Sequence, residues 1–584
     1  MSAGPEPRMH LRKYAFPTST PAISTRIKLS NVKSSLRTLF IFFTGLLPTI
    51  AAFGQTPALR GVVWQQPDDL REAISDLYEM RRVGVQAVRT DVIADERLLT
   101  VADGLGMQIF QEIPVENLTV LELQDTVAFA MRTLDQALAR ARQHPSARHF
   151  GLARMSDTSD PAACAYLEQL TQRVRQQGPE RARTYYVTPF IKADACTGAV
   201  DLVLLNTLDA EDPSALLVGF VEQDSVRVGR TGIGALGTWV DDGAGPGVRI
   251  PHSPQSQARY LENNLNRLFD RRAPVQPYAV FVHRWSDPVG SDATGVGLTP
   301  VAYGLHGEST SRPALDVVRG IYTGSQLVFA FDQGGEPSGS WPWITLLGWS
   351  GIAVLGVFYA ASPRLRFMIP RYFVAHGFYR DAVREGRDVL LGPSVALLAT
   401  EALATGVLWS AVINAYAGEY AFQMLLRWTA DPVRGLLMSA QSYPWVAVLI
   451  FAAVFVACAL LWSIILVLLS RRRYALSSSQ TMMLVVWSGW PLLLLLPAAM
   501  VVPALDADMA KTVSLTLLAI WGVVLLCAVV RTVYDFHDVT KVPVYFTLAA
   551  WLLNPHVLLV LALAVSVLFN VPEAAFLYHL LTRT

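Results

Sequence analysis

Charged side chains follow several predicted strands in the first half of this 584-residue chain. Asp91 and Glu112 lie near the ends of two strands, Arg154 and Asp157 follow a third, and Asp241 lies just beyond a fourth. Two converging carboxyl groups can act as an acid and a base. The Arg154 guanidinium is a rigid fork of donors that suits carboxylates or sulfates, as in an acidic sugar. The alternative for each acid is a solvated loop residue or a structural hydrogen-bond partner.

Alternating strand and helix patterns are expected to position these residues. Short apolar runs predict strands at 61–64, 87–90, 108–113, 149–153, 185–190, 202–206, 231–236 and 279–285. One-faced apolar spacing predicts helices at 68–83, 95–105, 124–143, 161–177 and 256–270. Eight strands alternating with helices predict a TIM-type (β/α)8 barrel, whose functional groups lie at the carboxyl ends of its strands.

Three segments, in their order and spacing, resemble the (β/α)8 domain of glycoside hydrolase family 2. They are Arg-Gly-Val-Val-Trp at 60–64 with Val-Gly-Val-Gln-Ala-Val-Arg at 83–89, then Met-Gln-Ile-Phe-Gln-Glu-Ile-Pro-Val-Glu at 107–116, then His-Pro-Ser-Ala-Arg-His-Phe-Gly-Leu-Ala-Arg-Met at 144–155. The resemblance spans the first half of the chain and stops before the apolar second half. It implies a carbohydrate or envelope glycan as the ligand.

The resemblance also implies that the family's two catalytic acids are replaced. Retaining glycosidases need an acid/base and a nucleophile, both carboxyl groups. The acid/base position falls on Met155, whose thioether cannot donate a proton, and the nucleophile position falls on Ala235. We therefore expect a catalytically degenerate barrel, a pseudoenzyme that binds its ligand. The alternative is an active hydrolase of O-glycosyl bonds that uses Glu112 or Asp157 as the acid.

Three further residues are candidate ligand contacts under this resemblance. Arg89 matches an arginine at the base of the family's pocket, and a buried ion pair is its alternative role. Trp285 ends the eighth predicted strand, where related barrels present an aromatic platform to the sugar, and Trp239 is a weaker candidate for stacking. Core packing is the alternative for both rings. No metal site or other cofactor is expected.

The four cysteines divide between the two halves of the chain. Cys458 and Cys527 lie within apolar runs and are expected to pack there. Cys164 and Cys196 follow the fourth and fifth predicted strands, so they would lie on one rim in adjacent units of the barrel. A disulfide between them is geometrically reasonable in an oxidising compartment, and the sequence leaves that pairing open.

Long apolar runs dominate the chain from residue 341 onward. A bilayer span needs about 20 mostly apolar residues. Six stretches meet this requirement, at 342–360, 390–416, 443–469, 479–503, 512–530 and 545–569. The formal net charge is +1, and no basic stripe stands out in the first half, so nucleic-acid binding is not expected. The lipid bilayer is the expected partner of the second half.

The positions of basic residues predict an orientation for these spans. Residues 1–37 form a basic leader, and 38–54 read as a signal sequence or signal-anchor helix, with cleavage left open. Arginines gather in the loops at 364–387 and 471–473, which the positive-inside rule places in the cytoplasm. We therefore expect a bacterial-type inner-membrane protein with a cytoplasmic N-terminus and a periplasmic or extracellular barrel. The arginine-rich segment 362–388 is either an amphipathic interfacial helix or an ordinary loop.

Glu401 is an acid within the second C-terminal span. Such residues are functional candidates, because charge is expensive inside a membrane. Prolines, among them Pro491 and Pro555, interrupt spans or mark their ends. A third hypothesis therefore makes the bundle the functional part, as a transporter or envelope-assembly component with a sensory barrel. The expected domains are the barrel at 55–331, a linker at 332–341 and six spans within 342–584.

Overall fold

The computed structural model describes residues 58–581, except 224–226, 228, 288–301, 308–309, 336–342, 388, 418 and 430. The predicted leader and signal segment, and most of the predicted linker, lie outside the described residues. The first half of the described chain is a closed barrel of eight parallel strands in sequential order. The TIM-type fold predicted from the sequence is therefore confirmed.

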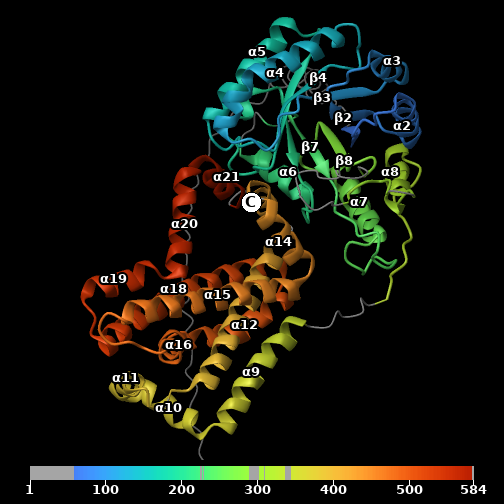
Figure 1. Cartoon of the computed structure of the whole chain (residues 1–584). Helices are drawn as coiled ribbons and strands as arrows, with labels where there is room; N and C mark the ends of the chain where they lie inside the picture. Colours follow the sequence, from blue (N-terminus) through green and yellow to red (C-terminus); the bar gives the residue numbers. More distant parts are fainter. Residues whose placement is uncertain are drawn as a thin grey trace, which may run out of the picture. The chain divides into compact units, whose positions relative to one another are not determined.

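The barrel strands agree with the predicted ones to within a few residues. They are β1 (Leu59–Val63), β2 (Ala87–Asp91), β3 (Gln108–Glu112), β4 (His149–Arg154), β5 (Arg183–Thr188), β6 (Leu202–Asn206), β7 (Thr231–Leu236) and β8 (Ala279–His283). Each strand pairs with its neighbour in the chain, and β8 closes the ring on β1. Figure 1 shows this ring of strands with helices outside it.

Seven helices surround the barrel, and several of them begin at residues whose side chains cap them. They are α2 (Leu70–Val83), α3 (Glu96–Leu105), α4 (Val120–Ala141), α5 (Ala162–Gln177), α6 (Pro213–Glu222), α7 (Pro254–Leu268) and α8 (Pro313–Thr323). The Asp69 and Asp95 side chains accept backbone N–H groups in the first turns of α2 and α3. Thr119 and Glu122 form a capping box at α4. Gly84 and Gly106 end α2 and α3 in the left-handed conformation that glycine adopts without strain.

Two apolar layers stabilise the barrel. The larger lies between the strands and the surrounding helices and includes Trp64, Leu77 and Leu134. The smaller contains Phe110, Tyr185, Met155, Leu204 and Phe281, drawn from strands around the ring and from the segment after β4. Side chains therefore fill the interior of the barrel, as in other barrels of eight strands.

The second half of the chain is entirely helical in its described residues. Four helices are long and apolar enough to cross a membrane: α9 (Trp343–Ala361), α12 (Leu391–Tyr416), α15 (Pro444–Ser470) and α18 (Ala507–Thr540). Two bent pairs bring the count to six if each pair is one span. The first pair joins α16 (Ser478–Trp487) to η4 (Trp490–Leu494) and α17 (Leu495–Val501), and the second joins α19 (Val544–Leu552) to α20 (Pro555–Phe569).

Four of the six predicted spans thus correspond to single candidate helices, and the other two correspond to the bent pairs. Pro491 lies in η4 and Pro555 begins α20, so these two prolines mark the two breaks. Between the first two candidate spans, the arginine-rich segment forms α10 (Pro363–Val374) and α11 (His376–Glu385). Three shorter helices complete the described bundle: α13 (Tyr420–Trp428), α14 (Asp431–Ser442) and α21 (Val571–Leu581).

Candidate functional site

The charged residues singled out in the sequence converge at the carboxyl ends of three neighbouring strands. Asp91 and Glu112 are the last residues of β2 and β3 and face each other in the ladder register. Arg154 is the last residue of β4, and Arg89 lies two residues before the end of β2. Parallel strands end at one rim of a barrel, and that shared rim brings these four residues together.

Glu112 is the centre of this cluster. Its Oε1 lies 3.2 Å from Arg89 Nε and accepts a hydrogen bond of 3.2 Å from the Tyr185 hydroxyl. Its Oε2 accepts a hydrogen bond of 3.2 Å from Arg154 Nη1. The side chain is 1% exposed. Both carboxylate oxygens are therefore occupied by protein donors within the rim.

Arg154 connects Glu112 to two more accessible acids. Its guanidinium lies 3.1 Å from Asp91 Oδ1 and 3.2 Å from Glu116 Oε2, and Glu116 is a member of the cluster that the sequence did not indicate. The Asp91 side chain is 60% exposed and that of Glu116 is 33% exposed. Three carboxylates thus face two guanidiniums, so the cluster carries a formal excess of negative charge.

Burial and charge act on Glu112 in opposite directions. Removal from water raises its pKa above the usual value, while the positive charges of Arg89 and Arg154 lower it, and burial is the larger effect. A raised pKa is a property of general acids. However, a general acid must also reach its substrate, and an almost fully buried carboxyl with both oxygens bonded does not.

Two glycines leave space for the cluster. A Cβ at Gly151 of β4 would lie 2.7 Å from Glu112 Cγ, and one at Gly234 of β7 would lie 2.9 Å from Arg89 Nη1. The same Arg89 nitrogen donates a hydrogen bond of 2.5 Å to the Gly234 carbonyl. Any larger residue at either position would push a charged side chain out of its place.

Met155 and Ala235, the positions assigned to the family's acids, are both buried. Met155 is 5% exposed, has a positive φ of 53°, and packs in the apolar interior of the barrel. Ala235 is 4% exposed, and its carbonyl accepts hydrogen bonds from the backbone N–H and the hydroxyl of Thr207. Neither side chain can exchange a proton.

Asp157, the second fallback acid, is held by its own loop. Its Oδ1 accepts a hydrogen bond of 2.5 Å from the Ser159 hydroxyl, and its Oδ2 lies 3.3 Å from His579 Nδ1 of α21.

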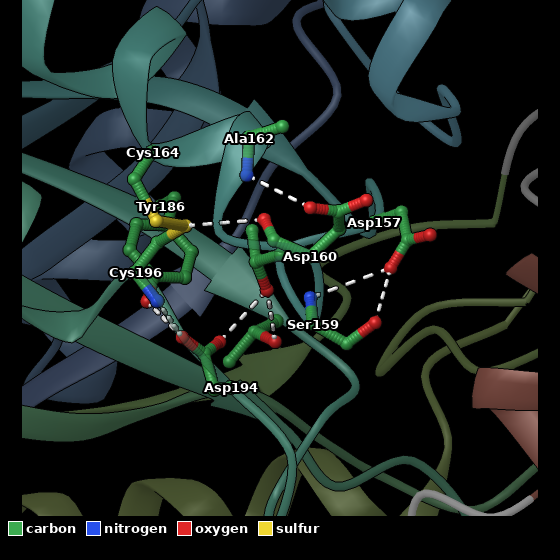
Figure 2. The surroundings of a disulfide bond; sticks show 10 residues. Asp157, Ser159, Asp160, Ala162, Cys164, Tyr186, Asp194 and Cys196 are labelled. Carbon is green, nitrogen blue, oxygen red and sulfur yellow. Dashed lines mark hydrogen bonds between the residues drawn. A yellow bond between two sulfur atoms is a disulfide. The ribbon is translucent and has the colours of Figure 1, made fainter.

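Figure 2 shows Asp157 and Ser159 beside the disulfide that joins Cys164 to Cys196, with an S–S distance of 2.07 Å. The pairing that the sequence left open is present. It closes a loop of 32 residues, a constraint that stabilises a fold by about 3–4 kcal/mol in the chain-entropy model.

The sequence did not indicate Asp194, a buried acid next to the disulfide. Asp194 accepts hydrogen bonds from the hydroxyls of Tyr186 (2.6 Å) and Thr158 (2.8 Å) and from the backbone N–H of Cys196 (3.0 Å), as Figure 2 shows in part. Burial raises its pKa, and these donors oppose that rise. With so many partners, Asp194 ties the segment after β5 to the segment after β4.

The two candidate tryptophans differ in exposure. Trp285 is 1% exposed and packs in the main core, where its ring lies 4.7 Å from that of His306, so neither face is open to a ligand in this arrangement. Trp239 is partly exposed and stacks on His252, with ring centroids 3.5 Å apart. Its backbone N–H donates to Asp209, whose other oxygen accepts from the Tyr303 hydroxyl at 2.5 Å. Trp239 is therefore the better placed of the two for stacking.

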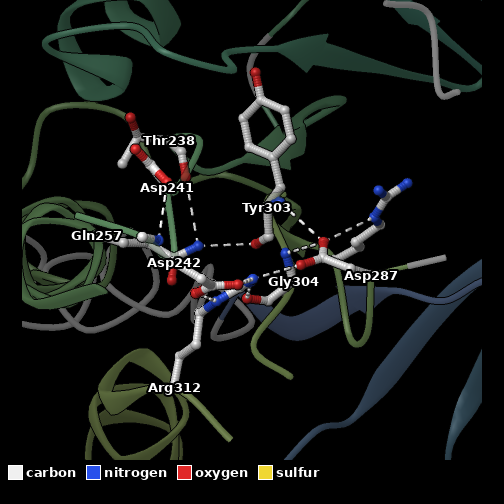
Figure 3. Close-up of polar contacts among 10 residues, drawn as sticks. Thr238, Asp241, Asp242, Gln257, Asp287, Tyr303, Gly304 and Arg312 are labelled. Carbon is white, nitrogen blue, oxygen red and sulfur yellow. Dashed lines mark hydrogen bonds and ion pairs between the residues drawn. The ribbon is translucent and has the colours of Figure 1, made fainter. Parts of the chain in front are cut away.

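The acids after β7 have different environments. Asp241 is exposed and accepts only from the N–H of Gly243 among the described contacts. Figure 3 shows that Asp242 and Asp287 both pair with Arg312, at 2.5 and 2.7 Å. Asp287 also accepts from the backbone N–H groups of Tyr303 and Gly304. This second network closes the segments after β7 and β8 onto α8, and the sequence did not reveal it.

No group of three or more metal-ligating side chains comes together among the described residues. In the helical bundle, Glu401 of α12 is 2% exposed, and its Oε1 lacks a hydrogen-bond partner among the described residues. Its surroundings differ from those of Glu112, although both are buried glutamates.

This chain is similar to a set of solved structures. No family model matches the chain, and no curated protein matches it. A family 2 β-galacturonidase from Eisenbergiella tayi, bound to galacturonate, is 17% identical, with a TM-score of 0.42 over 47% of this chain and 53% of that one. A β-glucuronidase from Ruminococcus gnavus in complex with D-glucaro 1,5-lactone is 15% identical, with a TM-score of 0.40 over 46% and 49%. The chain spans about half the length of these enzymes, and the likeness concerns the fold alone.

Proposed function

We propose that this chain is a membrane-anchored barrel that binds a carbohydrate at the carboxyl ends of β2–β4 and does not hydrolyse it. The observation that carries the proposal is the environment of Glu112, which is buried, hydrogen-bonded through its two oxygens to Arg154 and Tyr185, and ion-paired with Arg89. An acid held in this way contributes structure and charge rather than proton transfer. The candidate spans of the second half supply the anchor, and the positive-inside pattern favours a barrel on the outer side.

The charge of the cluster favours a neutral sugar. Arg154 is already surrounded by three carboxylates, so little of its positive charge remains for an acidic ligand. Asp91 and Glu116 are the more accessible members, and carboxylate oxygens accept hydrogen bonds from sugar hydroxyls. Trp239, partly exposed beyond β7, is the candidate ring for the apolar face of a sugar.

The test is a glycan array on the full chain in detergent, with neutral and uronic-acid glycans side by side. We expect saturable binding of neutral glycans, weakened about 10-fold or more when Asp91→Asn and Glu116→Gln are combined, because lost charge-assisted hydrogen bonds cost about 1.4 kcal/mol or more. Glu168→Gln, an exposed acid on α5, is the matched control and should leave binding unchanged. Preference for uronic acids, or binding that the double substitution does not affect, would contradict the proposed site.

The competing function is an active glycosidase, and the same sample distinguishes it. A panel of aryl glycosides should show no turnover above that of a heat-inactivated sample. Turnover that Glu112→Gln or Asp157→Asn abolishes would establish hydrolysis and refute the proposal of a degenerate barrel.

A further inference from the structure

The helical bundle contains a buried acid that sugar binding by the barrel does not involve. Glu401 lies in α12, the most buried of the candidate spans, and Oε1 of its carboxyl has no partner among the described residues. A carboxylate without a counterion is very costly to bury in an apolar bundle. An ionised Glu401 would therefore require a nearby positive charge, and otherwise the carboxyl must carry a proton.

Glu401 faces a cavity that contains a second unpaired titratable group. The cavity has a volume of about 20 Å³ and is lined mainly by apolar side chains of α12, α15, α16, α18 and α20. His556 of α20 also lines it, and neither ring nitrogen of His556 has a hydrogen-bond partner in the described structure. A cavity of this volume is large enough for one water molecule.

The cavity lies at a break in a candidate span. The chain bends by 45° between α16 and the segment that begins with η4, and Gly489 lies in that break. A Cβ at Gly489 would lie 2.9 Å from both carboxylate oxygens of Glu401. The glycine therefore lets the acid approach the broken backbone, an arrangement typical of ion and proton sites in membrane bundles.

We propose that Glu401 and His556 together bind one exchangeable proton. When the proton is on a Glu401 oxygen, both groups are neutral. When it moves to a ring nitrogen of His556, the carboxylate and the imidazolium compensate each other, so the cavity stays neutral in both arrangements. Loss of the proton leaves one uncompensated carboxylate, which the apolar lining disfavours.

A proton suits this cavity better than a metal ion. Hard cations require about six oxygen ligands. The polar side chains that line the cavity are Glu401, His556, Ser488 and the Trp462 indole, which donates to the Ala550 carbonyl. No cluster of three ligating side chains is present in the described part of the bundle.

Polar groups also connect the cavity to the segment between α10 and α11. The hydroxyls of Ser488 and Thr532 lie 2.6 Å apart. Thr532 and Asp535 are three residues apart on α18 and so share a face. Asp535 lies 2.9 Å from His376 Nε2, and Arg531 lies 3.4 Å from its other oxygen. These polar groups lie along α18 between the cavity lining and His376.

One further titratable group faces this region from α10. Tyr372 packs against Trp487, at the end of α16, with ring centroids 5.7 Å apart. Burial is the largest cause that raises the pKa of Tyr372 to about 12, and the negative charge of Asp535 contributes to the same rise. Tyr372 therefore stays protonated and does not supply the exchangeable proton near neutral pH.

The test is carbodiimide labelling of the full chain in lipid vesicles, read by peptide mass spectrometry. Dicyclohexylcarbodiimide partitions into apolar regions and reacts with protonated carboxyl groups. We expect it to label Glu401, and the labelling to fall as pH rises, whereas a water-soluble carbodiimide leaves Glu401 unlabelled. Glu401→Gln should remove the label without changing glycan binding by the barrel, so failure here is distinguishable from failure of the proposed function.

The role of His556 has its own matched control. His556→Asn should shift the pH midpoint of Glu401 labelling by about one unit or more, because the two groups share one proton. His537→Asn should not, because His537 lies outside the cavity and contacts Thr547 at 3.0 Å. If Glu401 labelling has the same pH midpoint in wild type and in His556→Asn, the proposal that the two groups share one proton is wrong.

A second measurement covers the case in which the reagent does not enter the cavity. Infrared pH-difference spectra of the same vesicles should contain a carbonyl band of a protonated carboxyl that Glu401→Gln removes. Hydrogen exchange of α12 amides confirms that the variant is folded. The absence of both the label and the band, or a label independent of pH, would overturn the proposal.

Discussion

Two glutamates, one at the barrel rim and one in the helical bundle, are equally buried and are treated in opposite ways. Glu112 is 1% exposed and is bonded to two guanidiniums and a tyrosine hydroxyl. Glu401 is 2% exposed and lines an apolar cavity with an unpaired histidine. Both carboxylate oxygens of Glu112 contact protein donors. In contrast, Oε1 of Glu401 has no hydrogen-bond partner in the part of the chain that the structure describes.

The different partners of Glu112 and Glu401 suit the two acids to different roles. A carboxylate bonded through both oxygens is a fixed charge that organises its neighbours, and removal of one partner exposes the cost of the buried charge. A buried carboxyl without a counterion favours its protonated form, so its charge depends on groups that can take up the proton. The barrel rim is therefore suited to binding by a fixed arrangement of groups, and the bundle cavity to a change of protonation state.

The largest expected effect tests how strongly Glu112 depends on its partners. Arg154→Ala leaves Glu112, Asp91 and Glu116 with Arg89 as the remaining guanidinium of the cluster, and we expect it to lower the unfolding free energy of the barrel by about 3–5 kcal/mol. Native-state hydrogen exchange of strand amides in the full chain measures this. Arg97→Ala, which breaks an exposed pair with Asp95, is the control and should produce no measurable change.

A double substitution identifies the cause of that loss. Adding Glu112→Gln to Arg154→Ala removes the buried charge, and so we expect it to recover part of the stability. Additive effects of the two substitutions would mean that Arg154 stabilises the barrel by packing alone, and the contrast with Glu401 would lose its basis.

The second prediction concerns a buried base that the barrel keeps neutral. His149 of β4 stacks on Phe110 at 3.9 Å, and its Nε2 lies 3.0 Å from the Tyr278 hydroxyl. Burial, together with the positive charges of Arg183 and Arg148, lowers its pKa to about 3. The unfolded chain binds this proton below about pH 6.5 and the folded chain does not, so stability is complete above that pH and is lost as pH falls.

We expect the barrel to lose roughly 3 kcal/mol between about pH 7 and about pH 4 through this residue. His149→Gln should flatten the pH dependence of strand opening, measured by hydrogen exchange corrected for its intrinsic rate. Bundle amides in the same sample are the internal control. An unchanged slope in the variant would show that His149 is not the cause of acid sensitivity.

The smallest effects come from glycine-to-alanine substitutions beside the two glutamates. Gly151→Ala places a methyl group 2.7 Å from Glu112 Cγ, and because three partners hold Glu112, we expect a loss of about 1–3 kcal/mol. Gly489→Ala places one against the Glu401 carboxyl, which can turn into its cavity, so the loss should be smaller. Gly104→Ala, with open space around it in α3, should be neutral or stabilising. Equal losses at Gly151 and Gly489 would contradict the difference between the two sites.

Much of the fold was predictable because its signals are local. Strand and helix periodicity depends on neighbouring residues, and it predicted all eight strands and five of the seven helices that the structure places around the barrel. Periodicity missed the helices at Pro213–Glu222 and Pro313–Thr323. Apolar runs likewise predicted all six candidate spans, and prolines marked the two that are broken.

The sequence also predicted that Arg89, Asp91, Glu112 and Arg154 lie at one rim, because parallel strands share their carboxyl ends. It did not predict their pairing. Arg89 bonds to the carbonyl of Gly234, 145 positions away, and Tyr185 reaches Glu112 across β4. The partners of Asp194 and Arg312 likewise come from separate strand ends, and no local pattern specifies them.

By itself, therefore, the sequence determined the eight strands, most of the helices around them, the parallel barrel, the candidate spans and the presence of an acid within one of them. Only the tertiary structure decided which charges are compensated: two guanidiniums on Glu112, and a cavity with His556 beside Glu401. The physical reason is that periodicity and capping act over a few residues, whereas the environment of a buried charge depends on side chains that folding brings from distant strands and helices.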